Sequence, residues 1–538
     1  MGLGARVSLG LAALVVGAMG LVYLNEALAQ APVYMGAESA HLIRALYGKA
    51  PALGQLDLPP ADDIAFTLLI RGLTYLTQTL LPWLRLLGGA AYVAGLLLVF
   101  QVSRRNMAAP AAVGVLLLAL AYPYHRFAFS ALPEGWYVLG LGASVLLTAR
   151  IYLTQPLAHG VLAGCLAAGL MLLKPQGLAV SAAFLVLAGL DLALGRRSWR
   201  AFAGRILTFA AGFLLTANGL HLLAGGDGVA PLSFFPAGHY GRFLHGGVDQ
   251  PAWIASARGL AAMICGAVIL AAVPALTGLL RIELRWLWTR GHGRFALEPQ
   301  ETAFLFTLLC LVFSIALNAL LAAGGDPARL WGRQFEAYAP MLWLAAAPFI
   351  AEFDKHGGAR WRTAMAAAPA AGLAGLIVCL LDGAVARPWD AAALSAFQLP
   401  APVGFLAGAL VILAAAVAIA ASRLAVLRVW LFGVLALALL ATAADLGWRR
   451  SQGRLDTELA AADALISQRP GEVALLASDP MERRFGYLML RARPTIVLAR
   501  ADDRRLAGAD TIVSLGGQPS APGWRIIFKG EAITIFAR

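Results

Sequence analysis

Hydrophobic and polar positions alternate along this chain in long blocks. Apolar runs of about 18 or more residues, each long enough to cross a bilayer as a helix, recur along almost the whole length. The residue-by-residue alternation typical of membrane β-barrel strands is not present in these runs. Only helices and closed barrels satisfy their backbone hydrogen bonds in lipid. The pattern therefore predicts an all-α polytopic membrane protein.

We predict about thirteen transmembrane helices from these runs. The first seven cover about residues 1–24, 84–105, 108–122, 134–150, 157–173, 177–194 and a segment ending near 223. The last six cover about residues 257–280, 302–323, 338–350 and three segments ending near 381, 421 and 444. The run 64–83 contains Arg71 and Gln78, so we expect an interfacial or re-entrant helix there rather than a clean span.

The composition fits a membrane protein, and the placement of charge predicts its orientation. The chain is 60% hydrophobic and 13% charged, whereas a soluble domain carries about 25% charged residues. The net charge of +13 lies mostly in short loops between apolar runs, which is weak evidence for nucleic-acid binding. With thirteen crossings, every strongly basic loop falls on the side of the N-terminus. The positive-inside rule then predicts a cytoplasmic N-terminus and a C-terminal segment on the periplasmic or extracellular side.

This topology places six loops outside the cytoplasm, of which the first and fourth are the long ones. They are 25–82, 123–133, 174–176, 224–256, 324–337 and 382–401. Ala27-Leu28-Ala29 resembles a signal-peptidase site, so cleavage there is an alternative to a retained first helix. All four cysteines lie inside apolar runs, which predicts small buried side chains, no disulfide and no metal cluster; they are Cys165, Cys265, Cys310 and Cys379.

Residues 447–538 differ from the rest of the chain and predict a small soluble α/β domain. We expect helices at 456–468 and 481–491, strands at 472–477, 495–499 and 511–515, and a hairpin formed by 524–528 and 532–536. The segment shows no nucleotide fingerprint and no catalytic motif. We therefore divide the chain into a transmembrane domain (1–446) and a periplasmic domain (447–538) with a docking or capping role.

The stretch 32–49, in the first external loop, contains the first group of candidate chemical residues. Tyr34, Glu38, His41 and Arg44 are spaced by four, three and three residues, which places them on one face of a helix. An acid, an imidazole and a cation would thus meet beside the membrane surface. An ordinary amphipathic helix in the headgroup layer is the alternative.

Further polar residues gather at the predicted external ends of helices. They are His125, Arg126, Glu134, Lys174, His239, Tyr240, Arg242, Arg333 and Tyr338. Charges near the membrane interior are costly and tend to mark substrate pathways. Lys174 lies between two apolar runs with no acidic neighbour in sequence, so a phosphate would be a suitable partner for its charge. The alternative is that its side chain snorkels, so that the ammonium reaches the membrane–water interface. Arg333 and Glu336 could instead form an ordinary helical ion pair.

This combination of charges suggests a type of reaction. The cations suit a phosphate or pyrophosphate, and a carboxylate suits a general base that deprotonates an acceptor hydroxyl. A sugar transferase working outside the cytoplasm would need a lipid-carried donor. An O-antigen polymerase or ligase, and a lipid-linked glycan transporter or flippase, are the two alternatives. Inverted repeats and broken helices, which would favour a transporter, are not visible in the sequence.

Five segments in the first 350 residues resemble the GT-C superfamily of polyprenyl-phosphate-sugar-dependent glycosyltransferases, such as protein mannosyltransferases and aminoarabinose transferases. They are 36–49, 84–105, 130–153, 160–180, which contains the turn Lys174-Pro175-Gln176-Gly177, and 332–344. The resemblance implies a bacterial inner-membrane enzyme that transfers a hexosyl or pentosyl group with inversion. Its donor would be a polyprenyl-phosphate sugar, its acceptor a glycan, a lipid or a protein, and its surroundings membrane lipids.

The resemblance also implies roles for individual residues. Glu38 takes the position of the family's catalytic acid, and Glu134 that of a second external acid. Lys174, Arg333 and Tyr338 would face the donor phosphate. Beyond the resemblance, we also expect Arg126 to bind this phosphate, and we expect other substrate contacts from His41, His125, His239, Tyr240 and Arg242. The family often has Asp or an Asp-Glu pair where this chain has Ala37-Glu38. This departure makes a metal site less expected, so we predict no metal and no cofactor.

Overall fold

The structure is a computed structural model. It describes residues 3–28, 38, 41, 42, 45, 64–77, 80–224, 250–289, 297–323, 330–356, 358–386, 390–397, 402–421, 426–451, 453–468, 471–477, 496–498, 508–515, 523–531 and 533–538. Their contacts divide the chain into two compact units. The helical unit comprises Met1–Tyr23, Gly89–Ala128 and Pro133–Asp445, and the mixed unit comprises Leu24–Gly88, Phe129–Leu132 and Leu446–Arg538.

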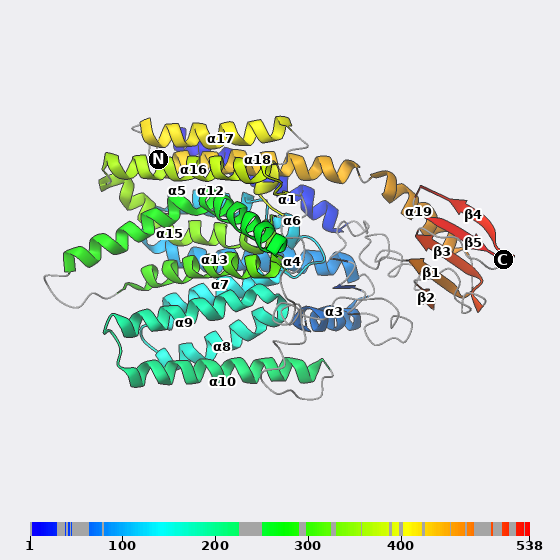
Figure 1. The fold of residues 1–538 in the computed structure, drawn as a ribbon, viewed down its shortest axis with the longest axis horizontal. Coiled ribbons are helices and arrows are strands. Elements are labelled where there is room, and N and C mark those ends of the chain that lie inside the picture. The colour runs from blue at the N-terminus through cyan, green and yellow to red at the C-terminus, as the bar shows by residue number, and fades with distance from the viewer. Residues whose placement is uncertain are drawn as a thin grey trace. The chain divides into compact units, whose positions relative to one another are not determined.

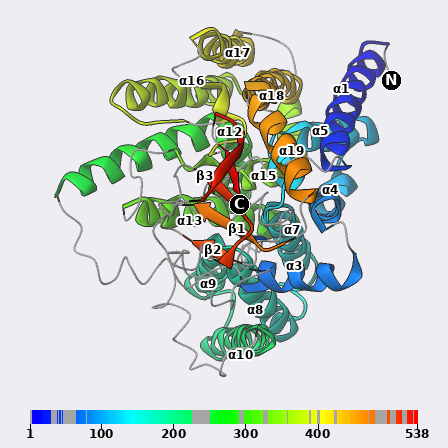
Figure 2. The same cartoon turned by 90° about the vertical axis from the view of Figure 1, so that its right-hand side faces the viewer.

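The helical unit consists of long apolar helices that run side by side (Figures 1 and 2). Its first part contains α1 (Leu3–Leu28) as far as Tyr23 and α4 (Leu80–Ser103) from Gly89 onward. It continues with η2 (Arg104–Asn106), α5 (Ala109–Ala121), α6 (His125–Ala128), α7 (Glu134–Ile151), α8 (Pro156–Leu173), η3 (Pro175–Gly177), α9 (Leu178–Ala193) and α10 (Trp199–Leu223). Its second part contains α12 (Gln250–Thr289), α13 (Pro299–Ala323), α14 (Gly332–Phe335), α15 (Tyr338–His356), α16 (Ala359–Leu381), η4 (Leu394–Phe397), α17 (Pro402–Ala421) and most of α18 (Val426–Ser451).

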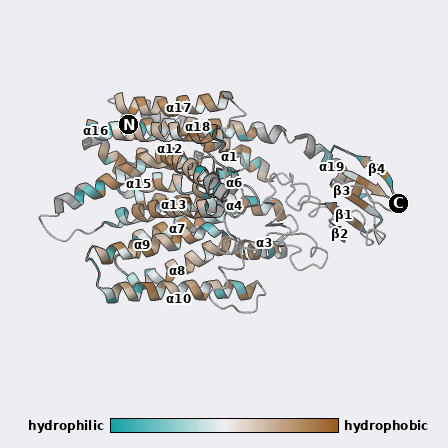
Figure 3. Ribbon diagram, in the orientation of Figure 1, coloured by the Kyte–Doolittle hydropathy of each residue, from teal (hydrophilic) through white to brown (hydrophobic). Residues whose placement is uncertain are grey.

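These helices confirm the predicted class of a polytopic helical membrane protein. In the described part of the chain, nine helices are long and apolar enough to cross a membrane. Four shorter apolar helices accompany them, and hydrophobic residues cover most of the ribbon in this unit (Figure 3). Every one of the thirteen predicted ranges contains a helix. That all thirteen cross the membrane stays a prediction, as does the division at residue 446.

Close packing within the helical unit depends on small residues. Helices α8 and α10 make the most extensive contact, and Gly160 and Gly164 stand four residues apart on the α8 side. A Cβ at either position would overlap the α10 backbone at Arg205 or Phe209. This is the close approach that small residues spaced by four allow between membrane helices. Helix α12 packs against α13, α15 and α16 and thus lies at the centre of this group of helices.

One predicted boundary in the first external segment was wrong. The run 64–83 forms helix α3 (Ile64–Leu76), but α4 already begins at Leu80, four residues before the predicted start at Leu84. Pro82 lies in the first turn of α4, where the missing N–H of proline costs no intrahelical bond. Pro82 thus belongs to the start of α4, whereas our prediction placed it in the preceding segment 64–83. The four cysteines are free thiols, and Cys310 is buried while the others are half-buried.

The mixed unit contains the predicted α/β segment. Helix α19 (Gly453–Ser467) precedes five strands, β1 (Val473–Ala477), β2 (Ile496–Leu498), β3 (Thr511–Leu515), β4 (Arg525–Lys529) and β5 (Thr534–Ala537). They form one sheet of order β2-β1-β3-β5-β4, in which β1 pairs in parallel with β2 and β3 while β5 pairs antiparallel with β3 and β4. The predicted strands and hairpin are therefore confirmed. The helix predicted at 481–491 lies outside the described residues.

Candidate functional site

The turn between α8 and α9 brings Lys174 into the interior of the helical unit. Lys174 caps α8 in an extended conformation, and Gly177 N–H donates to the Lys174 carbonyl at 2.8 Å. A Cβ at position 177 would overlap the backbone of Leu170 and Met171, so only glycine allows the chain to return this tightly. The predicted tight turn is confirmed. It leaves the Lys174 residue 5% exposed, although it stands at a helix end.

Lys174 is paired with an acid that the sequence does not place beside it. Lys174 Nζ lies 3.1 Å from Glu134 Oε1, and Arg333 Nε lies 3.2 Å from the same oxygen. The Glu134 side chain is 1% exposed, that of Lys174 6% and that of Arg333 16%. Lys174 has no acidic neighbour in sequence, and its acidic partner Glu134 comes from the start of α7, forty residues earlier. One carboxylate oxygen thus holds two cations in a buried site.

Burial and an aromatic ring shape the electrostatics of this site. The pKa of Lys174 is lowered to about 8, chiefly because burial disfavours the charged form; Glu134 opposes this effect and the nearby Arg333 adds to it. The Lys174 ammonium also lies 5.5 Å from the centre of the Tyr137 ring, a favourable cation–π distance. The hydroxyls of Tyr137 and Tyr338 are 2.5 Å apart. The predicted Tyr338 therefore lies next to this site through Tyr137.

Helix α14 and the segment around 390 hold Arg333 in place. Arg333 N–H donates to the Asp390 carbonyl, and the Tyr124 hydroxyl donates to the Arg333 carbonyl at 3.0 Å. Glu336 anchors the same segment, because its carboxylate accepts from the N–H groups of Ala392 and Ala393 at 2.9 and 2.6 Å. Burial raises the pKa of Glu336.

Glu336 and Arg333 thus contact different residues rather than forming the helical ion pair considered above. Glu336 also accepts a hydrogen bond of 2.6 Å from the Tyr122 hydroxyl, whereas Arg333 contacts Glu134. The two side chains therefore have different roles near the start of α15. Glu336 fixes the backbone of the 390–393 segment, and Arg333 supplies a cation to the buried site.

A chain of amide and hydroxyl groups links the two segments that carry the cations. Gln176 Nε2 donates to Asn318 Oδ1 at 3.2 Å, and Asn318 Nδ2 donates to Ser314 Oγ at 3.4 Å. Ser314 Oγ in turn donates to the Gln334 carbonyl at 3.0 Å. Gln176 belongs to the Lys174 turn and Gln334 follows Arg333, so helix α13 holds the two cations at a fixed spacing.

His125, a predicted substrate contact, and Arg126, predicted to bind the donor phosphate, lie in a second buried network of the helical unit. Arg126 Nη1 is 3.5 Å from Asp445 Oδ1, and both side chains are fully buried. The Tyr23 hydroxyl donates to Asp445 at 2.9 Å, and the Tyr23 ring packs edge-on against His125. This network connects α1, α6 and α18. The substrate roles of His125 and Arg126 stay predictions.

Glu38 lies in the mixed unit and is fully buried. Glu38 Oε1 accepts a hydrogen bond of 2.7 Å from Ala131 N–H, and Arg85 Nη2 lies 3.9 Å from the same oxygen. The residues described around Glu38 are helical, as predicted, and His41 packs edge-on against Phe66 at 5.3 Å. The backbone donor and the guanidinium together fix the orientation of this carboxylate.

Some site residues escaped the sequence analysis, and others cannot be placed. Arg85 stands inside an apolar run, which is the same signal that singled out Lys174, so the sequence could have revealed it. Tyr137 and Asp445 gave no comparable signal, because a tyrosine or a lone acid near a helix end is common. Three predicted residues, His239, Tyr240 and Arg242, lie outside the described residues. The described part of the chain holds no group of three or more His, Cys, Asp or Glu suited to a metal.

Fold and site define a polytopic helical membrane protein with a buried two-cation site. No family model and no curated protein matches its sequence. Its fold resembles the crystal structure of ArnT from Cupriavidus metallidurans in the apo state, with a TM-score of 0.50 and 14% identity. It also resembles ArnT from the same organism bound to undecaprenyl phosphate, with a TM-score of 0.54 and 15% identity. Each alignment covers 98% of this chain and 97% of that chain, so the fold likeness extends over nearly the whole length of both chains.

Proposed function

We propose that this protein is a membrane glycosyltransferase that takes its sugar from a polyprenyl-phosphate donor and transfers it to an acceptor hydroxyl on the periplasmic side. The observation that carries the proposal is the buried pair of cations, Lys174 and Arg333, on a single oxygen of Glu134. Two cations and one carboxylate leave the site with an excess positive charge. The binding of undecaprenyl phosphate by an ArnT of the same fold supports a lipid phosphate as the anion that these cations bind.

The chemistry of the two cations suits the leaving group of such a transfer. An ammonium has three N–H donors, of which Glu134 takes one, and a guanidinium offers a planar fork that matches phosphate oxygens. In the proposed reaction the bond between the anomeric carbon and the phosphate oxygen breaks, and its electron pair leaves with polyprenyl phosphate. Lys174 and Arg333 stabilise the negative charge that develops there.

Glu38 is the proposed general base. The acceptor hydroxyl attacks the anomeric carbon in line, a new C–O bond forms, and the hydroxyl proton passes to the Glu38 carboxylate. Arg85 and Ala131 N–H hold that carboxylate in one orientation. Inversion at the anomeric carbon follows from a single in-line displacement.

The test separates donor binding from transfer. Lipid mass spectrometry on the purified protein should find polyprenyl phosphate or its glycosylated form in the wild type and in Glu38→Gln. Lys174→Ala should lose this lipid, because the buried site loses a cation, whereas Arg258→Ala removes an exposed cation and should keep it.

Transfer should then fail in Glu38→Gln although the donor lipid stays bound. Survival of transfer in Glu38→Gln would exclude Glu38 as the base. If only bulk phospholipid is found, unchanged by Lys174→Ala, the proposed donor class is wrong and a transporter becomes the better explanation.

A further inference from the structure

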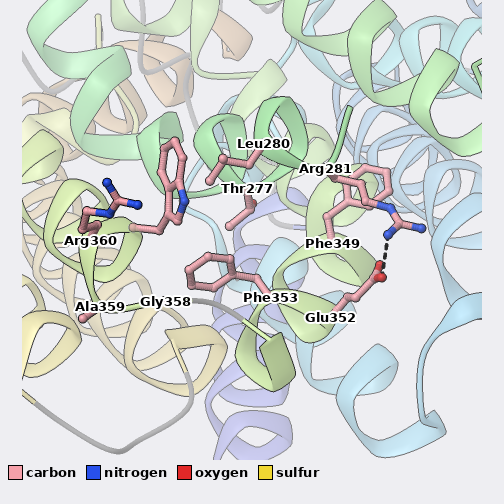
Figure 4. Close-up of a pocket in the computed structure, with 10 residues that line it drawn as sticks. Thr277, Leu280, Arg281, Phe349, Glu352, Phe353, Gly358, Ala359 and Arg360 are labelled. Atoms are coloured by element: carbon pink, nitrogen blue, oxygen red, sulfur yellow. Dashed lines mark hydrogen bonds and ion pairs between the residues drawn. The ribbon is translucent and has the colours of Figure 1, made fainter. Parts of the chain in front are cut away.

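A cavity lies near the end of α15 that is remote from Tyr338 and the two-cation site. Its volume is about 490 Å³, and it opens between α12, α15 and α16 in the helical unit (Figure 4). The walls are apolar, with Leu280, Phe349, Phe353 and Trp361. Cavities of about 300–1,000 Å³ with apolar walls and few polar groups are the usual size and character of ligand sites.

The cavity lies where three apolar helical segments end together. Charged residues interrupt the apolar sequence of each helix at this point, namely Arg281 on α12, Glu352 on α15 and Arg360 on α16. The cavity therefore stands at a membrane–water boundary, where amphipathic Trp and Arg side chains concentrate. Tyr338 and Phe353 are fifteen residues apart on α15, or about 22 Å at the helical rise of about 1.5 Å per residue. That distance covers most of a hydrocarbon core of about 30 Å, so the cavity faces the opposite leaflet from the two-cation site.

Cations at the rim give the cavity a net positive charge. Arg281 Nη1 is paired with Glu352 Oε1 at 2.6 Å on one side, and Arg360 stands on the other side of the cavity (Figure 4). Arg360 is exposed and makes no ion pair with any residue in the described part of the chain. Arg285, by contrast, is held by Glu298 and Glu301 at 2.8 and 2.7 Å. Arg360 is thus the cation available to a ligand of this cavity.

The start of α16 adds to the same preference for an anion. Gly358 caps this helix without a side-chain hydrogen bond, and Gly358, Ala359 and Arg360 line the cavity. The first N–H groups of a helix and its dipole attract negative charge. An occupant of this cavity therefore combines an apolar body with an anionic head at the membrane surface.

We propose that this cavity is a binding site for an anionic phospholipid of the leaflet opposite the two-cation site, with the lipid phosphate at Arg360 and an acyl chain along Phe353 and Leu280. Basic pockets between transmembrane helices bind anionic headgroups in this manner. The inference does not depend on the proposed transfer reaction. Phosphatidylglycerol represents the ligand class, and phosphatidylcholine, which has the same chains but no net charge, is its matched control.

The experiment uses the full chain reconstituted in vesicles that contain a photoreactive phosphatidylglycerol or phosphatidylcholine. Mass spectrometry of peptides covering 277–281 and 349–361 measures labelling of the cavity. We expect phosphatidylglycerol to label these peptides more strongly, and Arg360→Ala to lower its labelling about fivefold, since one arginine near a membrane surface contributes about 1 kcal/mol. Arg104→Ala removes an exposed arginine away from the cavity and should leave the labelling unchanged.

Two further measurements test whether the ligand in the cavity is a phospholipid. Ala359→Trp places a large side chain at the exposed mouth of the cavity and should abolish labelling by both lipids. Excess inorganic phosphate should not compete, because free phosphate lacks the acyl chains. Equal labelling by the two lipids, or full labelling in Arg360→Ala, would overturn the proposal. Displacement by inorganic phosphate, or cross-links from the cavity to residues 290–296 in place of lipid, would assign it to another occupant.

Discussion

The two ends of α15 carry the same set of charges in different surroundings. At the Tyr338 end, Glu134 contacts Lys174 and Arg333, and the three side chains are 1%, 6% and 16% exposed. At the other end, Glu352 contacts Arg281 beside Arg360, and the two paired side chains are 44% and 33% exposed. Each group has one carboxylate and two cations. Burial is the main difference between them.

Burial changes what such a group can do. Taking an ion out of water costs several kcal/mol, so a buried cation needs a partner at all times. An anionic substrate can therefore bind Lys174 and Arg333 strongly, either beside Glu134 or in its place. A half-exposed pair is worth about 0–1 kcal/mol, because water already solvates both ions. The group at the cavity can thus attract a lipid headgroup without being required for the fold.

The largest expected effect comes from breaking the buried group. Glu134→Ala leaves Lys174 and Arg333 buried without their shared oxygen, and we expect it to destabilise the protein by about 3–5 kcal/mol. Thermal unfolding in detergent measures this loss, and Glu352→Ala, at the exposed group, is the matched control with a shift of at most about 1 kcal/mol. Equal losses of unfolding free energy in Glu134→Ala and Glu352→Ala would contradict the view that burial distinguishes the two groups.

A smaller loss is expected when the turn that carries Lys174 is disturbed. Gly177→Ala introduces a Cβ that overlaps the backbone of Leu170 and Met171. Overpacking of this kind costs about 1–3 kcal/mol and shifts the local backbone. We expect weaker retention of the donor lipid together with a lower unfolding temperature. Gly169→Ala in the preceding helix α8, where a Cβ meets no atom within 4 Å, is the control and should change neither quantity.

The titration of Lys174 provides the third test. Its pKa of about 8 in the folded protein lies below the usual 10.5, because burial disfavours the charged form. Affinity for a lipid phosphate should therefore fall above pH 8, by up to about tenfold per pH unit. Between pH 8 and 10.5 the unfolded chain binds more protons at this site, so the contribution of Lys174 to the free energy of unfolding rises with pH.

Lipid binding and stability should thus change in opposite directions with pH. Lys174→Arg keeps a charge at all these pH values and should give a flat binding profile above pH 8. Binding to the wild type and to Lys174→Arg is measured by retention of polyprenyl phosphate on purified protein across pH 7 to 10. Parallel profiles in the two proteins would show that Lys174 does not titrate against the phosphate.

The comparison also shows which features were accessible from sequence. Hydropathy and turn residues are local signals, and they predicted the helices, the five strands and the Lys174 turn. The partner of Lys174 is a long-range feature, because Glu134 is brought to it by the packing of α7 against α8. Sequence spacing cannot reveal such a contact. The same holds for Arg85, which becomes the neighbour of Glu38 only through folding.

The start of α4 illustrates a different reason for a wrong prediction. Two apolar segments with little polar sequence between them give no hydropathy boundary, so Pro82 was assigned to the end of the first rather than the start of the second. Glu38 and Lys174 were singled out because charge near the membrane is costly. The cavity at Arg360 escaped notice because arginines in basic loops are expected from topology alone.

The smallest expected effect comes from breaking the exposed ion pair between Arg281 and Glu352. Arg281→Ala removes the partner of Glu352, yet both side chains reach water, so we expect a loss of at most about 1 kcal/mol. The loss should shrink further at high salt, because ions screen exposed charges over about 3 Å at 1 M. The destabilisation in Glu134→Ala should persist in the same salt, since salt does not enter a buried site. A salt-independent loss in Arg281→Ala would mean that this pair is as shielded as Glu134 and Lys174, and that burial does not separate the two ends of α15.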